Sequence, residues 1–182
     1  IYYTKETLES IYISGVSGSL DVKTKFTGFS TKEFVPVRFT YSVTSAETEW
    51  QISGTVDKET REVYIKSGSM PVVTVKPPTK EWYFANDFLD KLLAEGIEFD
   101  KEYQGTIWSP DLLNFVPISI TFVGEIEYEY QGDMINTYKT RIGTYDMEQF
   151  AYIDASNIYY FLEVKNSSHR FLRVEEDEVP EL

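Results

Sequence analysis

The sequence of 182 residues has no cysteine and a single histidine, His169. The lack of cysteine excludes disulfide bonds, thiolate catalysis and cysteine-ligated zinc, and one histidine excludes any site that needs two from this chain. Basic residues are also few: 17 lysines and arginines stand against 30 acidic residues and give a formal net charge of −13. Such an acidic chain is a poor partner for nucleic acid, because phosphates are bound by basic surfaces.

Long apolar runs are missing as well, and no stretch approaches the roughly 20 residues that span a bilayer. The chain begins at Ile1 rather than Met, and we expect a processed or excised form whose signal sequence is absent from this chain. The many Tyr, Thr, Ser and Phe residues in short strands favour an exported bacterial domain, periplasmic or extracellular. The acidic end, residues 175–182, is predicted to be a solvated terminus.

Apolar and polar residues alternate along most of the chain, and this pattern predicts β-strands with one buried and one wet face. Such strands are typical of antiparallel sheets. In the longest case, residues 118–130, we expect an inward face of Ile118, Ile120, Phe122 and Ile126 and an outward face of Thr121, Glu125, Glu127 and Glu129. Further strands are expected near 19–27, 37–43, 50–56, 61–66, 72–76, 102–108, 135–142, 149–154, 157–164 and 169–175.

One segment, residues 86–95, has helical rather than strand periodicity. Phe88, Leu89, Leu92 and Leu93 form one apolar stripe. Asn86 is suited to the N-cap, and Gly96 is placed for a left-handed stop at the C-terminal end. We expect this helix to cover one face or end of a curved sheet.

These patterns predict a mainly β fold: a curved antiparallel sheet or partly open barrel with one covering helix, in a single domain over 1–182. A faint internal echo relates 34–40 to 115–121, and the turn at Asp57 to the turn at Asp154. The two offsets differ, 81 against 97 residues, so a duplication of about 1–76 and 97–175 would require an insertion. Chance similarity between amphipathic strands is the other interpretation.

Several short motifs of low specificity follow one another between residues 86 and 174. They are the helical 88–92, Trp108-Ser109-Pro110-Asp111, the long strand 116–129, Gly132, Tyr152-Ile153-Asp154 and Leu162-Glu163-Val164. This half of the chain resembles a family of uncharacterised bacterial periplasmic domains. The resemblance implies a curved antiparallel sheet, similar to half-barrel envelope domains such as lipoprotein carriers, and it transfers no catalytic residue. The first 75 residues match it poorly, so their topology stays open.

Chemistry-bearing residues are sparse. Glu125, Glu127 and Glu129 have spacings of about 6.8 Å that overlap the carboxylate separations of inverting glycosidases, but a wet strand face is the plainer interpretation. Lys139 and Arg141 are expected to reach this glutamate face through a shift of register by one residue. His169 is predicted to be a surface residue near the acceptor-like triplet 166–168. Residues 15–18 and 28–30 read as turns, and Asp57 and Asp154 as residues that cap their own turns.

The 29 aromatic residues exceed what the alternating strands require. Alternation assigns no core position to seven of them: Tyr2, Tyr3, Trp82, Tyr83, Phe84, Trp108 and Tyr159. Strand or core filler is one interpretation, but clustered rings also bind sugars or apolar chains and form protein interfaces. We predict a cleft between the helix and the strand 116–130, lined by Trp82, Phe84, Phe88, Leu92, Phe122 and Tyr128.

The sequence thus predicts a non-catalytic binding or interaction domain of the cell envelope, without catalytic residues, metal or cofactor. Its partner would be an apolar small molecule in the concave face of the sheet, or a protein. The alternatives are a structural module of a larger exported protein and a carboxylate-based carbohydrate hydrolase.

Overall fold

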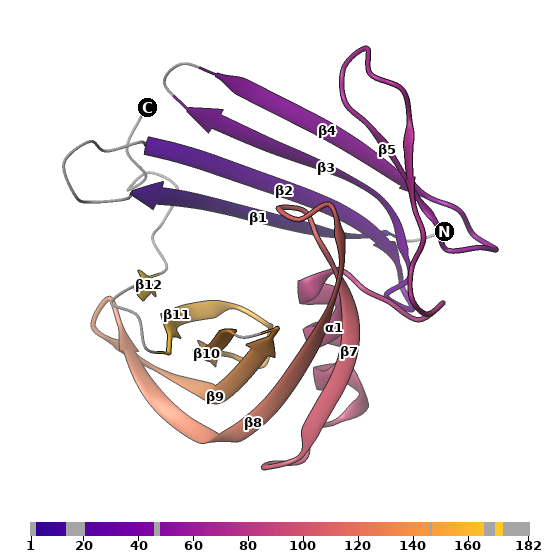
Figure 1. Cartoon of the computed structure of the whole chain (residues 1–182). Coiled ribbons are helices and arrows are strands. Elements are labelled where there is room, and N and C mark those ends of the chain that lie inside the picture. Colours follow the sequence, from indigo (N-terminus) through magenta and orange to yellow (C-terminus); the bar gives the residue numbers. More distant parts are fainter. Residues whose placement is uncertain (1–2, 14–20, 46–47, 146, 166–169, 173–182) are drawn as a thin grey trace. The chain divides into compact units, whose positions relative to one another are not determined.

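The computed structural model describes residues 3–13, 21–45, 48–145, 147–165 and 170–172, and its strands form two antiparallel sheets (Figure 1). Sheet A holds β1 (Tyr3–Ile13), β2 (Asp21–Thr31), β3 (Pro36–Ser45), β4 (Glu49–Val56), β5 (Val63–Lys66) and β6 (Val73–Val75). Sheet B holds β7 (Glu102–Ser109), β8 (Asn114–Tyr130), β9 (Asp133–Thr144), β10 (Met147–Ile153), β11 (Tyr159–Val164) and β12 (Arg170–Leu172). Between β6 and β7 in sequence lies α1 (Ala85–Glu95), the helix of the described part of the chain. The predicted fold class, antiparallel β with one helix, is confirmed.

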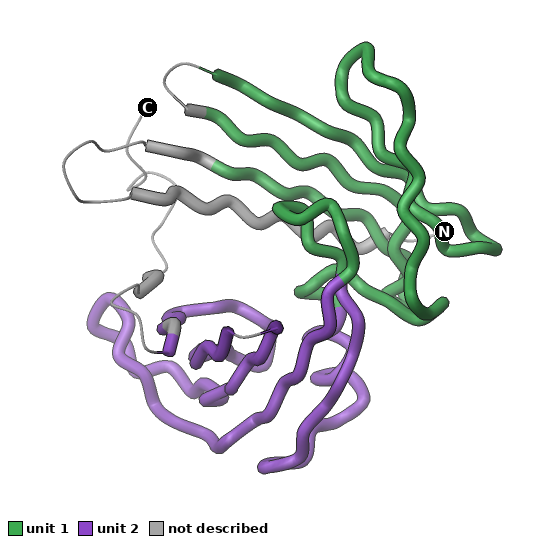
Figure 2. Tube along the Cα trace, in the orientation of Figure 1, with its two compact units in different colours: residues 1–87, 108–115, 181–182 green, residues 88–107, 116–180 purple. Residues whose placement is uncertain are grey.

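Both sheets are meanders, because each strand lies beside its neighbours in sequence. Within the described residues the chain divides into two compact units (Figure 2). Unit 1 runs to Asp87 and includes Trp108–Phe115; unit 2 comprises Phe88–Ile107 and the chain from Val116 onward. The prediction of a single domain over 1–182 is not tested by this division.

Of the two pairs of similar segments, only one pair occupies equivalent positions in the two sheets. Asp57 and Asp154 both follow the fourth strand of their sheet, at equivalent positions of the two meanders. The other pair is not equivalent, because 34–40 leads into the third strand of sheet A and 115–121 lies in the second strand of sheet B. Duplication of about 1–76 and 97–175 stays a prediction.

The core of unit 1 is built largely from aromatic rings. It contains Phe26, Phe39, Tyr41, Ile52, Val63, Ile65, Trp82, Phe84, Trp108 and Phe115. Phe39 stands at its centre, with ring centroids 5.4 Å from Trp108 and 6.1 Å from Phe84. Edge-on and tilted contacts of this kind are favourable for aromatic rings and add to the free energy of burial.

The helix is found where its periodicity places it, with one correction at its start. Phe88, Leu89 and Leu92 are buried, as the apolar stripe predicts. Gly96 has a φ of +89° and ends the helix in the left-handed conformation. The prediction that Asn86 is the N-cap is wrong, since the helix already begins at Ala85.

The acidic residue in the first turn of the helix is Asp87, which is 2% exposed. Its carboxylate accepts a hydrogen bond from the hydroxyl of buried Ser30 on β2. A carboxylate in this turn also interacts favourably with the positive end of the helix dipole. These interactions offset the cost of burying the carboxylate.

The long strand β8 contains a β-bulge that the sequence analysis did not foresee. Phe122 lies opposite Thr140 of β9, but Gly124 lies opposite Lys139, so Val123 is an extra residue. Because partners in an antiparallel ladder share a face, Gly124 and every second residue after it lie on the face opposite to Phe122.

This bulge corrects the predicted faces of β8. Ile118, Ile120 and Phe122 are buried as expected, whereas Ile126, expected inward, is 40% exposed. Thr121, expected to be solvated, is 5% exposed, but it precedes the extra residue, so the bulge does not account for its burial. Strict alternation holds only up to the extra residue, and beyond it the strand presents the opposite face.

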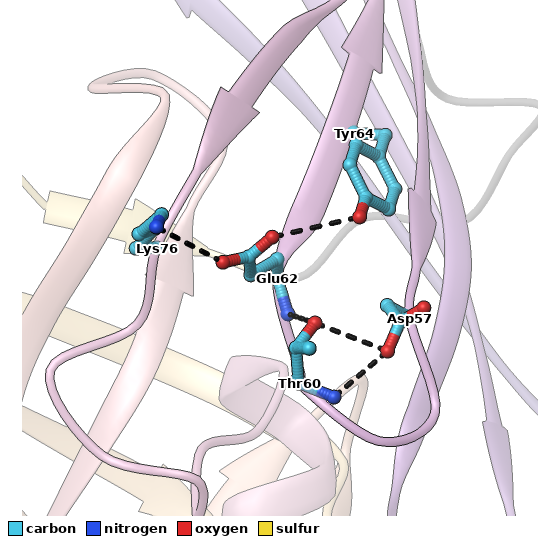
Figure 3. A network of polar contacts seen from close by, with 5 residues as sticks. All are labelled: Asp57, Thr60, Glu62, Tyr64 and Lys76. Carbon is cyan, nitrogen blue, oxygen red and sulfur yellow. Dashed lines mark hydrogen bonds and ion pairs between the residues drawn. The ribbon is translucent and has the colours of Figure 1, made fainter.

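The turn after β4 shows why Asp57 is needed there (Figure 3). Its Oδ1 accepts hydrogen bonds from the amides of Glu59, at 2.9 Å, and Thr60, at 2.7 Å. Glu62, which follows, accepts from the hydroxyl of Tyr64 at 3.5 Å and lies 3.5 Å from the ammonium of Lys76.

The equivalent turn after β10 is built in the same way. Asp154 accepts from the amides of Ser156 and Ile158, at 2.8 and 3.0 Å. The expectation that both aspartates cap their own turns is confirmed.

The Asp57 turn predicts a specific pH dependence of stability. The amides of Thr60 and Glu59 lower the pKa of the Asp57 carboxyl from its usual value. Because folding lowers this pKa, the stabilisation is complete above the unfolded-state pKa of about 4 and is lost as the pH falls through the folded-state value. We expect the stability difference between the native chain and Asp57→Asn to be largest near pH 6 and to shrink below pH 4. Urea unfolding of both proteins across this range measures it; a constant difference would contradict the expectation.

Candidate ligand-binding face

The structure distributes the six sequence-predicted site residues among separate groups. Trp82 and Phe84 belong to the core of unit 1, with exposed fractions of 1% and 0%. Their ring centroids are 6.0 Å apart, and the indole nitrogen of Trp82 donates to the backbone carbonyl of Arg61 at 3.1 Å. Both rings therefore pack against the chain's own side chains.

Of the remaining four residues, which lie in unit 2, three are also buried. Phe88 and Leu92 are 4% and 5% exposed, and Phe122 is 0% exposed, with its ring 5.9 Å from that of Tyr138. Tyr128 is half-buried, and the bulge places it on the opposite face of sheet B from Phe122. Those two residues do not line one surface, and ligand binding by the set of six stays a prediction.

Tyr128 instead belongs to a second group of rings, contributed by three strands. Its ring centroid lies 5.3 Å from that of Tyr152 on β10 and 6.2 Å from that of Phe161 on β11. The register places all three on one face, since Tyr152 is opposite both Phe161 and Lys139, and Lys139 is opposite Gly124. Phe150, two residues before Tyr152, lies on this face too. We call this surface, with Ile126, Tyr128, Phe150, Tyr152 and Phe161, the aromatic face.

The contacts of Tyr128 show that sheet B is curved. Its strand β8 and the strand of Phe161, β11, are three positions apart in the sheet. Strands in a flat sheet are spaced so that these backbones would be about 14 Å apart, with the side chains parallel. The 6.2 Å ring separation requires the sheet to curl toward the aromatic face, and β8 to β11 curl visibly (Figure 1).

Thr137 of β9 lies at the base of the aromatic face, between the rings and the backbone of the sheet. This residue lies opposite Ile126 and is 2% exposed. Its hydroxyl donates to the backbone carbonyl of Ile126 at 2.9 Å, so its polar group is already satisfied. The rings above it are half-buried rather than buried. The arrangement is an apolar surface with rings that retain exposed area.

The same face carries the two basic residues of β9. The Lys139 ammonium lies 5.4 Å from the ring centroid of Phe150. Arg141 is opposite both Thr121 and Phe150, and its Nη2 donates to the Thr121 hydroxyl at 3.3 Å. The prediction that these cations reach the glutamate face is wrong. The bulge lies on β8, and it turns the lysine toward Ile126 and Tyr128 instead.

The three glutamates of β8 are exposed, as expected for a wet strand face. Glu125, Glu127 and Glu129 lie opposite Tyr138, Asn136 and Met134. Among the described residues no group of three or more histidine, aspartate or glutamate side chains is placed to hold a metal ion. Within the same part of the chain no helix is both long and apolar enough to cross a membrane.

Several sequence-based expectations lie outside the described residues. They concern Tyr2, the turn at 15–18, the triplet 166–168, His169 and the acidic end 175–182. The side chain of Tyr3 is likewise not described. The expected turn at 28–30 is described and is wrong, because these residues lie within β2.

No family model matches the sequence, and no curated protein does. The fold, however, is similar to a solved one. A structure described as a beta-barrel-like protein of Domain of Unknown Function DUF1849, from Brucella abortus, matches with a TM-score of 0.67. The match covers 92% of this chain and 78% of that chain, at 9% sequence identity, so the likeness is one of fold alone. It agrees with the resemblance of this sequence to an uncharacterised barrel-like domain.

Most of the aromatic face was not predicted from the sequence. Phe150, Tyr152 and Phe161 were not expected to line a binding surface, because they lie in ordinary alternating strands. One signal was available: Gly124 interrupts the apolar series of β8, and glycine within a strand often marks a bulge. A bulge there would have moved Tyr128 to the face of Tyr152.

Proposed function

We propose that this chain is a non-catalytic binding domain of the bacterial cell envelope, which holds an apolar molecule on the aromatic face of sheet B. The observation that supports this most directly is the cluster of Tyr128, Tyr152 and Phe161 on the curled sheet. Their rings contact one another and are half-buried. Half-buried aromatic rings lose water on binding an apolar body and need little reorganisation to do so.

The periplasmic or extracellular location is part of the same proposal. It is supported by the composition of the strands and by the sequence resemblance to periplasmic half-barrel domains. Fractionation of the native host, with an antibody against this chain, would test the location independently of any ligand.

The carbohydrate-hydrolase alternative has less support. An inverting hydrolase needs one carboxyl kept protonated, usually by burial, opposite a second carboxylate across the substrate. Glu125, Glu127 and Glu129 are all exposed and lie on one strand. A structural module of a larger exported protein is distinguished from a binding domain by the experiment that follows.

Binding is tested by titration with N-phenyl-1-naphthylamine, a neutral dye that fluoresces in apolar surroundings. We expect saturable binding that Tyr152→Ala weakens by about tenfold or more, since each aromatic contact contributes of the order of 1 kcal/mol beyond its area. Tyr64→Ala removes a half-buried strand tyrosine from sheet A and is the matched control. Tyr152→Phe, which keeps the ring, should bind nearly as the native chain does.

Circular dichroism confirms that each variant is folded before it is titrated. Absence of saturable dye binding to the native chain would overturn the proposal. The alternative function, a structural module of a larger exported protein, would then remain. An equal loss in Tyr64→Ala and Tyr152→Ala would overturn the assignment to the aromatic face.

A further inference from the structure

The aromatic face differs from a purely apolar surface because it contains two cations. Lys139 lies between Gly124 of β8 and Tyr152 of β10, and Arg141 lies between Thr121 and Phe150 in the same three strands. They are two residues apart on β9, so their side chains leave the sheet on the same side. Both therefore project from the surface that carries the rings.

Neither cation forms an ion pair with a carboxylate in the part of the chain that the structure describes. The polar contact of Arg141 is the hydroxyl of Thr121, a neutral acceptor, and the ammonium of Lys139 lies over the Phe150 ring. In a chain with 30 acidic residues against 17 basic ones, two neighbouring cations without a carboxylate partner among the described residues require an explanation.

Three described acidic residues share this face by register: Glu148, Glu163 and Asp133, which lies opposite Tyr130 and six residues before Lys139 on β9. Glu148 pairs with Lys165 at 2.8 Å. Glu163 is opposite Phe150 and, on its other side, opposite Arg170 of β12 in the strand register. None of these three carboxylates forms an ion pair with Lys139 or Arg141 in the described part of the chain.

Lys139 is half-buried, whereas Arg141 is exposed. A half-buried cation beside aromatic rings has lost part of its hydration, and an anion that arrives there regains favourable electrostatic energy. The guanidinium of Arg141 can hold a carboxylate through two parallel hydrogen bonds, and the Lys139 ammonium adds a point charge two residues away. The adjoining rings would cover an apolar body attached to the carboxylate.

We propose that the ligand of the aromatic face is a monomeric anionic amphiphile, an apolar chain or ring system that ends in a carboxylate. This inference rests on the proposed function. Lys139 and Arg141 bind the carboxylate, and Tyr128, Tyr152 and Phe161 cover the apolar part. A free molecule is favoured over an anionic membrane surface, because a chain of net charge −13 is repelled by such a surface.

The test compares decanoate with 1-decanol, which share a chain length and differ in charge. Each displaces N-phenyl-1-naphthylamine at pH 7.5 and low salt, where decanoate is ionised. We expect decanoate to bind at least tenfold more tightly than decanol. Lys139→Met and Arg141→Gln should each weaken decanoate binding by about five- to tenfold and leave decanol binding unchanged. Lys66→Met, an exposed lysine of β5, is the control and should change neither.

The outcomes separate this inference from the function on which it rests. If decanoate and decanol bind equally, and the two variants change neither, the charged site is refuted and an apolar binding domain remains. If the dye does not bind the native chain at all, the proposed function itself fails. If the chain binds phosphatidylglycerol vesicles but not decanoate, the ligand is a membrane surface and the assignment of a free amphiphile is overturned.

Discussion

Substituting alanine for Gly54 is expected to destabilise the chain by about 3 kcal/mol, a large effect for the addition of one methyl group. A Cβ at Gly54 would lie 2.1 Å from one ring carbon of Phe39 and 2.3 Å from another. Phe39 is 2% exposed, and its ring is held by Phe26, Phe84 and Trp108 at centroid distances of 5.7, 6.1 and 5.4 Å. The ring has no room to retreat, so the core of unit 1 must shift as a whole.

Chemical denaturation followed by tryptophan fluorescence measures this cost. Gly124→Ala is the matched control, because Gly124 is also a strand glycine and a Cβ there would meet nothing within 4 Å. We expect the control to change the free energy of unfolding by less than about 0.5 kcal/mol. Phe39→Leu, which shortens the obstructing side chain, should recover part of the loss when combined with Gly54→Ala. Equal stabilities of the two alanine variants would contradict the proposed ring-on-glycine contact.

Inserting one alanine between Lys139 and Thr140 is expected to be at least as damaging, at about 3 kcal/mol or more. The inserted residue would give Val123 a partner, but β9 also pairs with β10. One ladder can keep its register only if the other is broken. Either Tyr152 leaves the aromatic face or Ile153, which is 0% exposed, loses its buried place.

Deletion of Val123 is the counterpart of that insertion. The deletion removes the extra residue of the bulge and leaves all other partners of β8 and β9 as they are. We therefore expect it to cost much less than the insertion and to preserve dye binding. Urea unfolding and dye titration of the two variants compare them. A deletion as destructive as the insertion would show that the bulge itself, and not the register beyond it, holds this region together.

Local patterns were sufficient to predict most elements of the fold. The helix near Phe88 to Leu92 and its glycine stop follow from periodicity and capping within about a dozen residues. The caps at Asp57 and Asp154 depend on hydrogen bonds that span four residues at most. Such features are decided by short-range geometry, which a single sequence contains in full.

The candidate site was predicted far less well, for two different reasons. Trp82 and Phe84 lie outside any alternating strand, so the sequence does not state which rings will cover them; the structure buries both in the core of unit 1. Tyr128 was placed on the wrong face, because one extra residue in β8 reverses every position beyond it. An error of one residue in register is enough to move a side chain from one surface to the other.

Composition and local periodicity are enough to establish that the chain is acidic, free of cysteine and composed of amphipathic antiparallel strands with one amphipathic helix. Those properties are sums or short-range periodicities, and they do not depend on which segments meet. The pairing of distant strands establishes that the strands form two meanders, that Val123 is unpaired, and that Tyr128, Tyr152, Phe161, Lys139 and Arg141 share one face. Strand register is set by long-range pairing, in which β8 and β11 are brought together across two intervening strands, and no local pattern encodes that pairing.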